Sequence, residues 1–210
     1  MSEKPEKGGY LRQAWLVILL ALLYGAALAG VQTTLGPIIA ENKRQETYQQ
    51  IPKLIGMPPV SDADRQRLKI EERIVEDADG KPQVVYLAFF DDEPQGWVLP
   101  AGGQGFADRI EVLVGLDATV STVKGLYVLD QKETPGLGDF IRGEDFRNQF
   151  VDKSAAENVV VVKTDPAPAS NQITALSGAT ISSESVAQIV NDAIKNYQEA
   201  IRQQSLTPTE

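Results

Sequence analysis

An uninterrupted apolar segment near the N-terminus constrains this chain more than any other feature of its sequence. No charged residue occurs between Arg12 and Glu41, and residues 15–31 are apolar throughout. A helix of about 20 apolar residues is long enough to span the hydrocarbon core of a bilayer. The segment therefore predicts a transmembrane helix, which we place at residues 13–38, behind a short polar tail at residues 1–12.

A cleavable signal peptide is the competing interpretation of the same segment. Ala27-Leu28-Ala29 before Gly30 resembles a small-residue cleavage site. The apolar run is long for a signal peptide and continues to Leu35, which favours a retained anchor. Basic residues flank the span on both sides, so the positive-inside rule does not decide its orientation.

The composition of the chain excludes several classes of function. The sequence has 29 acidic and 20 basic residues, a net charge of −9, and neither cysteine nor histidine. The acidic balance disfavours a nucleic-acid partner. The missing residue types exclude thiolate-ligated iron–sulfur clusters, His-ligated haem, Ser-His-Asp hydrolysis and most zinc sites. Redox chemistry in such a chain would therefore need an organic cofactor.

Beyond the apolar segment, the sequence predicts one soluble domain. A polar helical stretch at residues 41–50 should end at Pro52, and we assign residues 39–60 to a juxtamembrane helix and linker. The domain itself is expected at residues 61–203, followed by a tail at residues 204–210.

Residue patterns within this domain predict an α+β fold, in which helices pack against an antiparallel sheet. Strands are expected at residues 83–90, 109–116, 119–130 and 158–163, the second and third forming a hairpin. The spacing of Phe140, Ile141, Phe146 and Phe150 predicts a helix at residues 139–155. A strongly amphipathic helix should begin just after Thr180 and continue to Ile201.

Three segments could carry chemistry, and the first is glycine-rich. Residues 100–106 follow Gly96-Trp97 and lie between expected strands, without the lysine or the following helix of a P-loop. By itself this segment predicts a wide turn.

The second segment is Glu133-Thr134-Pro135-Gly136-Leu137-Gly138-Asp139. Pro-Gly at its centre fits a type II turn, in which glycine supplies the positive φ. Gly138 additionally leaves backbone N–H groups unshielded, as a ligand pressed against the main chain would require. The residues alone leave both interpretations open.

The third segment is Thr174-Ala175-Leu176-Ser177-Gly178-Ala179-Thr180, at the start of the last helix. Its hydroxyl groups could cap the helix, and Ser182 or Ser183 could do so equally well. Alternatively, the small residues clear space around the Thr180 hydroxyl, while the helix N-terminus favours a phosphate.

These segments together resemble a known family. Ser177-Gly178-Ala179-Thr180 resembles the flavinylation motif of the FMN-binding domain shared by the G subunit of the Rnf electron-transport complex and the C subunit of the sodium-pumping NADH:quinone oxidoreductase. The 133–139 segment and the Gly96-Trp97, Pro100 and Gly105-Phe106 pattern are also similar to that family. The short chain is more similar to the Rnf G subunit. Thr174 stands where the family motif usually has an acidic residue, a departure that bears on the efficiency of modification and not on its location.

The resemblance implies the cofactor, the site and the cellular setting. FMN would be bound covalently through a phosphoester to Thr180. The residues implied to bind the cofactor with Thr180 are Leu176, Ser177, Gly178, Ala179, Glu133, Thr134, Pro135, Gly136, Leu137, Gly138 and Trp97. The chain would be an electron relay with no catalytic residue of its own. Its partners would be the other membrane subunits and, during maturation, a flavin transferase, with the FMN domain on the periplasmic or outer face of the bacterial inner membrane.

Two other classes of function stay open at this point. A membrane-anchored binding or assembly module without cofactor would share the anchor and the sheet. A flavin-dependent reductase that acts on a small substrate would share the cofactor. The C subunit of the sodium-pumping reductase is the alternative within the family.

Overall fold

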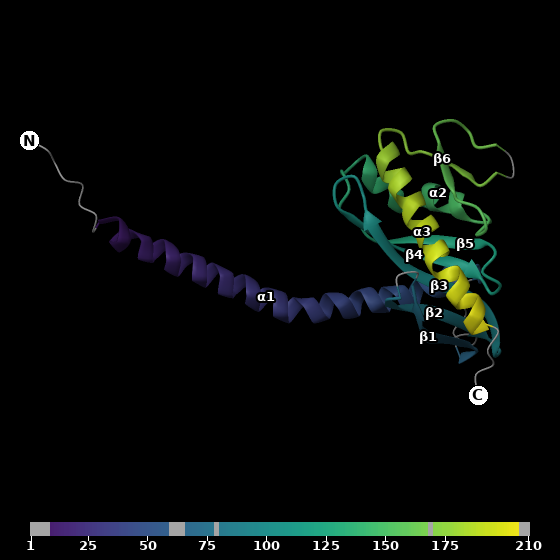
Figure 1. The fold of residues 1–210 in the computed structure, drawn as a ribbon, viewed down its shortest axis with the longest axis horizontal. Helices are drawn as coiled ribbons and strands as arrows, with labels where there is room; N and C mark the ends of the chain where they lie inside the picture. The colour runs from purple at the N-terminus through teal and green to yellow at the C-terminus, as the bar shows by residue number, and fades with distance from the viewer. Residues whose placement is uncertain (1–8, 59–65, 78–79, 168–169, 206–210) are drawn as a thin grey trace, which may run out of the picture. The chain divides into compact units, whose positions relative to one another are not determined.

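The computed structural model describes residues 9–58, 66–77, 80–167 and 170–205 (Figure 1). The chain divides into two compact units, Met1–Gln45 and Glu46–Glu210. Most of the expected N-terminal tail (1–12), the end of the expected linker (59–60) and most of the expected C-terminal tail (204–210) lie outside the described residues.

The first helix, α1 (Gly9–Leu54), contains the predicted membrane span. Among the described residues, it is the one helix long and apolar enough to cross a membrane. The large apolar side chains of its predicted span are exposed; Leu20, for example, is 70% exposed. A helix of this length whose apolar side chains are unburied is consistent with a membrane anchor.

The helix continues beyond Pro52, so the expectation that proline ends it was wrong. Its end is a Schellman motif: Met57 donates to the Pro52 carbonyl, Gly56 donates to the Lys53 carbonyl, and Gly56 has φ +77°. Ile51, Leu54 and Ile55 are buried there. Packing of these side chains against the sheet offsets the backbone hydrogen bond that proline removes.

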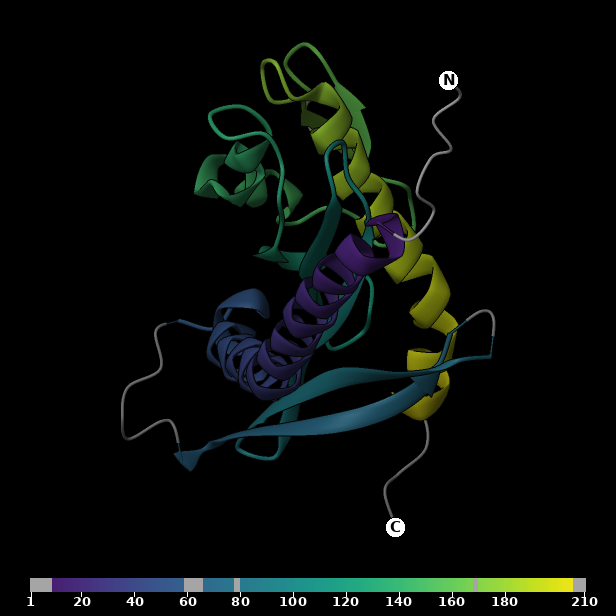
Figure 2. The ribbon, with the colours of Figure 1, turned by 90° about the vertical axis from the view of Figure 1, so that its left-hand side faces the viewer.

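The second unit contains a five-stranded antiparallel sheet in the order β1-β2-β3-β4-β5, which confirms the predicted fold class. Figure 2 shows β1 and β2 as a long two-stranded ribbon. The strands are β1 (Leu68–Glu76), β2 (Pro82–Phe90), β3 (Glu93–Gln104), β4 (Arg109–Asp117) and β5 (Val123–Asp130).

The predicted hairpin at residues 109–130 is confirmed, but its connection is longer than expected. β5 begins at Val123 rather than at residue 119. The Asp117 carboxylate accepts hydrogen bonds from the backbone N–H groups of Ser121 and Thr122 and from the Thr119 hydroxyl. These side-chain contacts hold residues 118–122 in a loop instead of a strand.

The glycine-rich segment expected as a wide turn is mostly strand, because β3 runs through to Gln104. β3 pairs with β2 only as far as Val98. Pro100 lies beyond this point, so its missing N–H removes no hydrogen bond between β3 and β2. The turn itself is short: Gly105 N–H donates to the Asp108 carbonyl (2.8 Å). This strand was not predicted because glycine and proline have low β-propensity.

The predicted helix at residues 139–155 was wrong. The segment forms three short helices, η2 (Gly138–Arg142), α2 (Glu144–Arg147) and η3 (Asn148–Phe150). Gly143 adopts an extended conformation between the first two and interrupts the helical path. Ile141, Phe146 and Phe150 are nonetheless buried together in the core.

The strand expected at residues 158–163 is confirmed in shorter form as β6 (Val160–Val162). It pairs in parallel with β7 (Gln172–Thr174), an unexpected strand. The predicted amphipathic helix is confirmed as α3 (Thr180–Ser205), which crosses the sheet in Figure 1.

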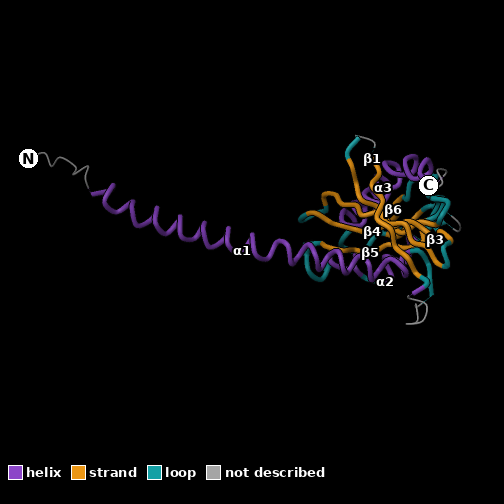
Figure 3. Tube along the Cα trace, turned by 90° about the horizontal axis from the view of Figure 1, so that it is seen from below, coloured by secondary structure: helices purple, strands orange, loops and turns teal. Residues whose placement is uncertain are grey.

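Two apolar clusters cover opposite faces of the sheet. Side chains alternate along each strand, so Trp97 and Leu99 join the α3 cluster while Val98 joins the cluster around residues 51–55 at the end of α1. Figure 3 shows the sheet between α3 and the last turns of α1.

Glycines allow the end of α1 to lie directly on the sheet. A Cβ built on Gly115 would overlap the Leu54 carbonyl oxygen, and one built on Gly125 would lie 2.9 Å from the same oxygen. Any side chain at these positions would push the helix end away from the strands.

We therefore expect a graded loss of stability when these glycines are replaced. Gly115→Ala should lower the free energy of unfolding by about 3 kcal/mol and Gly125→Ala by about 1 kcal/mol, since overpacking costs are of this order. Urea unfolding of the full chain in detergent, followed by tryptophan fluorescence, measures both.

Gly102→Ala is the matched control in the same sheet. Its Cβ would meet the flexible Arg109 guanidinium, which can move aside, at 2.8 Å. It would lie 3.2 Å from the Ile110 carbonyl oxygen, a contact that a shift of a few tenths of an ångström relieves. An equal loss of stability in all three variants would contradict the close packing of α1 on the sheet.

Candidate functional site

A buried carboxylate joins the segments that the sequence singled out. Glu133 is 4% exposed. Its Oε1 atom accepts a hydrogen bond from the Ala107 backbone N–H (3.0 Å), and its Oε2 atom accepts one from the Ser182 hydroxyl (2.5 Å). Ala107 belongs to the turn after β3 and Ser182 to the first turn of α3. One side chain thus links three parts of the chain that are distant in sequence.

Two glycines make room for this carboxylate. A Cβ on Gly138 would lie 2.9 Å from the Ser182 hydroxyl oxygen and 3.0 Å from Glu133 Oε2. A Cβ on Gly105 would overlap Glu133 Oε1. Gly138 is therefore required by the packing around Glu133, a reason that the sequence did not suggest.

The segment after Glu133 forms the predicted type II turn. Leu137 N–H donates to the Thr134 carbonyl (3.2 Å), and Gly136 has φ +76°, which glycine adopts without steric cost. Asp139 N–H donates to the same carbonyl (3.3 Å). Thr134, Pro135 and Gly136 are exposed, so the turn presents its backbone at the surface.

The segment before α3 forms a second turn, which contacts the first. Ala179 N–H donates to the Leu176 carbonyl (3.0 Å), and Gly178 has φ +77°. A Cβ on Gly178 would lie 2.9 Å from the Leu137 Cδ2 atom. The structure therefore brings the 133–138 and 176–180 segments side by side.

The hydroxyl groups near the start of α3 differ in their availability. Ser182 and Ser183 are buried. Ser182 donates to Glu133, and the Ser183 hydroxyl donates to the Ala179 carbonyl (2.9 Å) while accepting from Leu176 N–H (3.0 Å). Neither serine thus caps the helix in the way the sequence suggested. Thr180, the first residue of α3, is half-buried, and Ser177 is exposed.

The surface around these turns can receive an aromatic, phosphate-bearing group. Four large apolar side chains are exposed on the converging segments: Phe106 (61%), Leu137 (45%), Phe140 (56%) and Ile181 (54%). The Oδ1 atom of Asp139 is buried without a hydrogen-bond partner among the described residues. The N-terminus of α3 supplies unpaired N–H donors and positive partial charge.

Trp97 lies apart from this convergence. It is 2% exposed and pairs with Leu116 in the sheet, whereas the turn that contacts Glu133 follows Gln104 at the other end of β3. Seven residues of strand span roughly 23 Å. A role for Trp97 in cofactor binding stays a prediction.

Sequence reasoning missed two partners of the site, Ala107 and Ser182. Ala107 contributes only its backbone, which no residue pattern marks. Ser182 was considered only as a cap. The signal that could have found it is Glu133 itself, because a buried carboxylate needs hydrogen-bond donors.

Comparisons with known proteins agree with this geometry. The family model of the FMN-binding domain matches residues 105–195, which contain the three converging segments. The G subunit of the ion-translocating oxidoreductase complex of Methanosarcina acetivorans is 30% identical over 178 residues, or 84% of each chain. The G subunit of the Na⁺-translocating ferredoxin:NAD⁺ oxidoreductase complex of Acetobacterium woodii is 37% identical over 115 residues, covering 54% of this chain and 55% of that protein.

The fold is similar to that of a related protein. The crystal structure of Shewanella oneidensis NqrC superposes with a TM-score of 0.68 at 18% identity, covering 80% of this chain and 100% of that one. The C subunit of the Na⁺-translocating NADH-quinone reductase of Parabacteroides distasonis gives 0.61 at 21% identity, covering 80% of this chain and 96% of that one.

The Glu133–Ser182 contact should be measurable as a coupling energy. Ser182→Ala should lower the free energy of unfolding by about 2 kcal/mol, because it leaves a buried carboxylate oxygen without its donor. Glu133→Gln and the double variant complete a double-mutant cycle, in which we expect about 1–2 kcal/mol of coupling.

Ser183→Ala provides the matched control. Ser183 is also buried and adjacent in sequence, but its hydroxyl contacts Ala179 and Leu176 instead of Glu133. Its effect should add to that of Glu133→Gln within about 0.5 kcal/mol. Additivity in the Ser182 cycle would show that Glu133 does not hold the start of α3.

Proposed function

Since this chain belongs to the family of the G subunits of ion-translocating oxidoreductase complexes, we propose that it is the FMN-carrying electron-transfer subunit of an Rnf-type complex. The convergence of the 105–108, 133–139 and 176–180 segments at the N-terminus of α3 carries this proposal. FMN supplies one- and two-electron transfer when bound, and this chain holds and shields it.

We assign covalent attachment of FMN, through its phosphate, to the Thr180 hydroxyl. Of the four hydroxyl-bearing residues between positions 177 and 183, Ser182 and Ser183 are buried and engaged in hydrogen bonds. Ser177 and Thr180 are left for a modifying enzyme. Of these two residues, Thr180 is the one in the first turn of α3, where the helix dipole and free N–H groups would stabilise a phosphate.

The exposed apolar side chains beside Thr180 support a site for the flavin ring. Leu137 comes from the turn that contacts Gly178, Ile181 comes from the first turn of α3, and both are about half exposed. An isoalloxazine ring lying against them would cover apolar surface that is otherwise in water.

Coverage of the relatives favours the G subunit over the C subunit of the NADH-quinone reductase. The G subunit of Methanosarcina acetivorans matches over 84% of each chain. The C subunit of Vibrio anguillarum matches at 34% identity over 109 residues, only 49% of this chain and 43% of that protein. The C-subunit assignment is the second candidate, supported by the shared fold.

The remaining parts of the proposal concern the setting of the subunit. Residues 13–38 would cross the bacterial inner membrane, and the domain at residues 61–203 would carry FMN on the periplasmic or outer side. The other membrane subunits of the complex would exchange electrons with this FMN and couple the transfer to Na⁺ or H⁺ movement. A flavin transferase would attach the cofactor during maturation.

Thr174, where the family motif usually has an acidic residue, lies at the end of β7. Its backbone is held by the Gln149 side chain, which accepts from Thr174 N–H (2.7 Å) and donates to the Thr174 carbonyl (3.4 Å). The Thr174 backbone is thus held in place by Gln149, and whether its side chain affects the efficiency of modification stays a prediction.

The test of the attachment site is the mass of the Thr180 peptide. In protein made with an active flavin transferase, this peptide should be heavier by one FMN less water. Thr180→Ala should abolish covalent flavin, measured as ultraviolet fluorescence after denaturing electrophoresis. Thr180→Ser should retain part of it, because serine offers the same oxygen.

Ser177→Ala is the control for Thr180→Ala, because it removes the other available hydroxyl. It should leave the flavin in place. Flavin found on Ser177, or an unmodified Thr180 peptide beside an active transferase, would contradict the assignment.

The anchor is tested by fractionation. The full chain should sediment with membranes and resist extraction by alkaline carbonate, because residues 15–31 have no charge to expose. N-terminal sequencing of the mature protein is the second measurement. A mature protein that begins at Gly30 would establish the signal-peptide interpretation instead.

A further inference from the structure

A buried carboxylate lies directly behind the surface on which we place the flavin ring. Glu133 is 4% exposed, and its Oε2 atom accepts from the Ser182 hydroxyl. A Cβ on Gly138 would lie 3.0 Å from the same oxygen. Gly138 follows Leu137 and Ser182 follows Ile181, the two residues proposed to contact the ring. The carboxylate would therefore lie on the order of 10 Å from the ring, since neighbouring Cα atoms are about 3.8 Å apart.

This carboxylate has no cation beside it to balance its charge. Within the part of the chain that the structure describes, Glu133 forms no ion pair. Its donors, the Ala107 backbone N–H and the Ser182 hydroxyl, are neutral. The adjacent Lys132 is exposed and pairs with Asp108 instead (3.6 Å). Because Glu133 is buried, salt and water screen its charge less than they screen a charge at the surface.

Two other features contribute to the electrostatic potential at the site. The N-terminus of α3 supplies positive partial charge, but in the proposed attachment to Thr180 the phosphate of FMN lies there and balances it. Asp139, two residues after Leu137, is partly buried, and its Oδ1 atom has no hydrogen-bond partner among the described residues. The flavin ring would thus lie in a negative potential.

We propose that the carboxylate of Glu133, with that of Asp139, gives the FMN of this chain a low reduction potential. The inference rests on the proposed function. Above neutral pH, reduction of a flavin by two electrons takes up one proton and leaves one negative charge on the isoalloxazine ring. A nearby carboxylate repels that charge, so the oxidised ring is favoured and the reduced flavin is a stronger electron donor to the next cofactor.

The size of the effect follows from the distance and the burial. At about 10 Å, with the effective dielectric constant of proteins, the repulsion between two unit charges changes an equilibrium constant about tenfold. Glu133 therefore has two roles in this inference. Its hydrogen bonds hold the 133–139 segment against the start of α3, and its charge acts on the ring through space.

The test compares midpoint potentials in the full chain, made with an active flavin transferase and purified in a neutral detergent. Reductive titration at pH 8 is followed by the visible absorption of the flavin. Glu133→Gln removes the charge at constant shape, and its amide can still accept from Ala107 N–H and donate to the Ser182 oxygen. We expect the equilibrium constant for reduction to rise about tenfold, an upward shift of about 30 mV for a two-electron couple.

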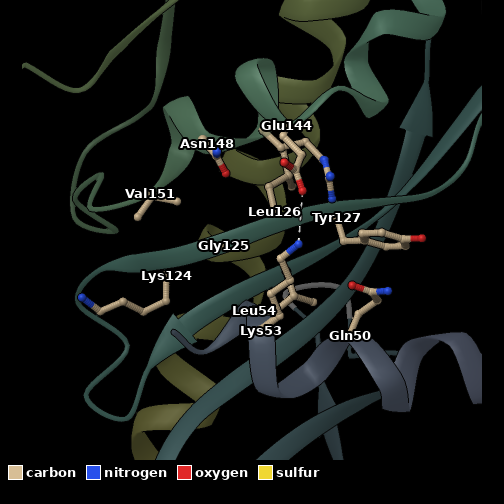
Figure 4. Close-up of a pocket in the computed structure, with 11 residues that line it drawn as sticks. Gln50, Lys53, Leu54, Lys124, Gly125, Leu126, Tyr127, Glu144, Asn148 and Val151 are labelled. Carbon is tan, nitrogen blue, oxygen red and sulfur yellow. Dashed lines mark hydrogen bonds and ion pairs between the residues drawn. The ribbon is translucent and has the colours of Figure 1, made fainter. Parts of the chain in front are cut away.

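Two control variants separate the charge of Glu133 from its packing and from surface charge in general. Ser182→Ala breaks the same hydrogen bond but keeps the carboxylate, so it should not raise the potential. Glu144→Gln removes a carboxylate that is 69% exposed and pairs with Lys53 (3.3 Å), the contact drawn as a dashed line in Figure 4. It should change the equilibrium constant less than about twofold, because its partner and the salt screen this charge.

Asp139→Asn is the second variant, for the case in which Glu133→Gln does not fold. It also removes one negative charge at constant shape. The equilibrium constant for reduction should rise about threefold, less than in Glu133→Gln, because the Asp139 side chain is only partly buried.

Other results would overturn the inference. An unchanged potential in flavin-bearing Glu133→Gln protein would show that the carboxylate does not act on the ring, and so would an equal upward shift in Ser182→Ala or Glu144→Gln. Where Glu133→Gln does not fold, an unchanged potential in Asp139→Asn has the same meaning. Unmodified wild-type protein beside an active transferase would overturn the proposed function and this inference with it, so the two failures are distinguishable.

Discussion

The buried carboxylate of Glu133 is the interaction on which the arrangement of this site depends. A carboxylate removed from water is destabilising unless donors satisfy it, and here a backbone N–H and a serine hydroxyl do so from two different segments. Because both donors are required, the turn after β3 and the start of α3 must lie on either side of the 133–139 segment. The glycines at 105 and 138 follow from the same constraint, since neither position has room for a Cβ. One buried polar group, the Glu133 carboxylate, thus specifies how these segments pack together.

The sheet behind this site is packed on both faces by helices that differ in their constraints. α3 packs through an ordinary apolar stripe, which includes Val186, Val190 and Ala193. The end of α1 approaches so closely that its backbone, at the Leu54 carbonyl, meets Gly115 and Gly125. Because glycine has no side chain, these two strand positions bury no side chain against the helix, and the helix backbone can lie closer to the strands. This close approach holds the last turn of the helix against the strands, in addition to the ion pair between Lys53 and Glu144.

The sequence predicted the parts of this structure that depend on local periodicity, and failed where tertiary contacts decide. The apolar helix, the 109–130 hairpin and α3 each have a regular hydrophobic pattern, and each is present. β3 was not predicted because its prolines and glycines are unfavourable in a strand, although Pro100 lies beyond Val98, where the pairing of β3 with β2 stops. The 139–155 helix was predicted from phenylalanine spacing, but Gly143 divides it. The site was located through motifs, whereas its assembly through Ala107 and Ser182 could not be read from any pattern.

The exposure of the site explains why covalent attachment would suit it. Leu137, Ile181, Ser177 and Gly178 are all exposed, so a flavin lying against them would remain partly in water. A ligand that stays partly exposed buries less apolar area and is held more weakly than one enclosed in a cavity. An electron relay benefits from such exposure, because its cofactor must come close to the cofactors of other subunits. The proposed phosphoester to the first residue of α3 would resolve the conflict, since it would prevent dissociation without enclosing the ring.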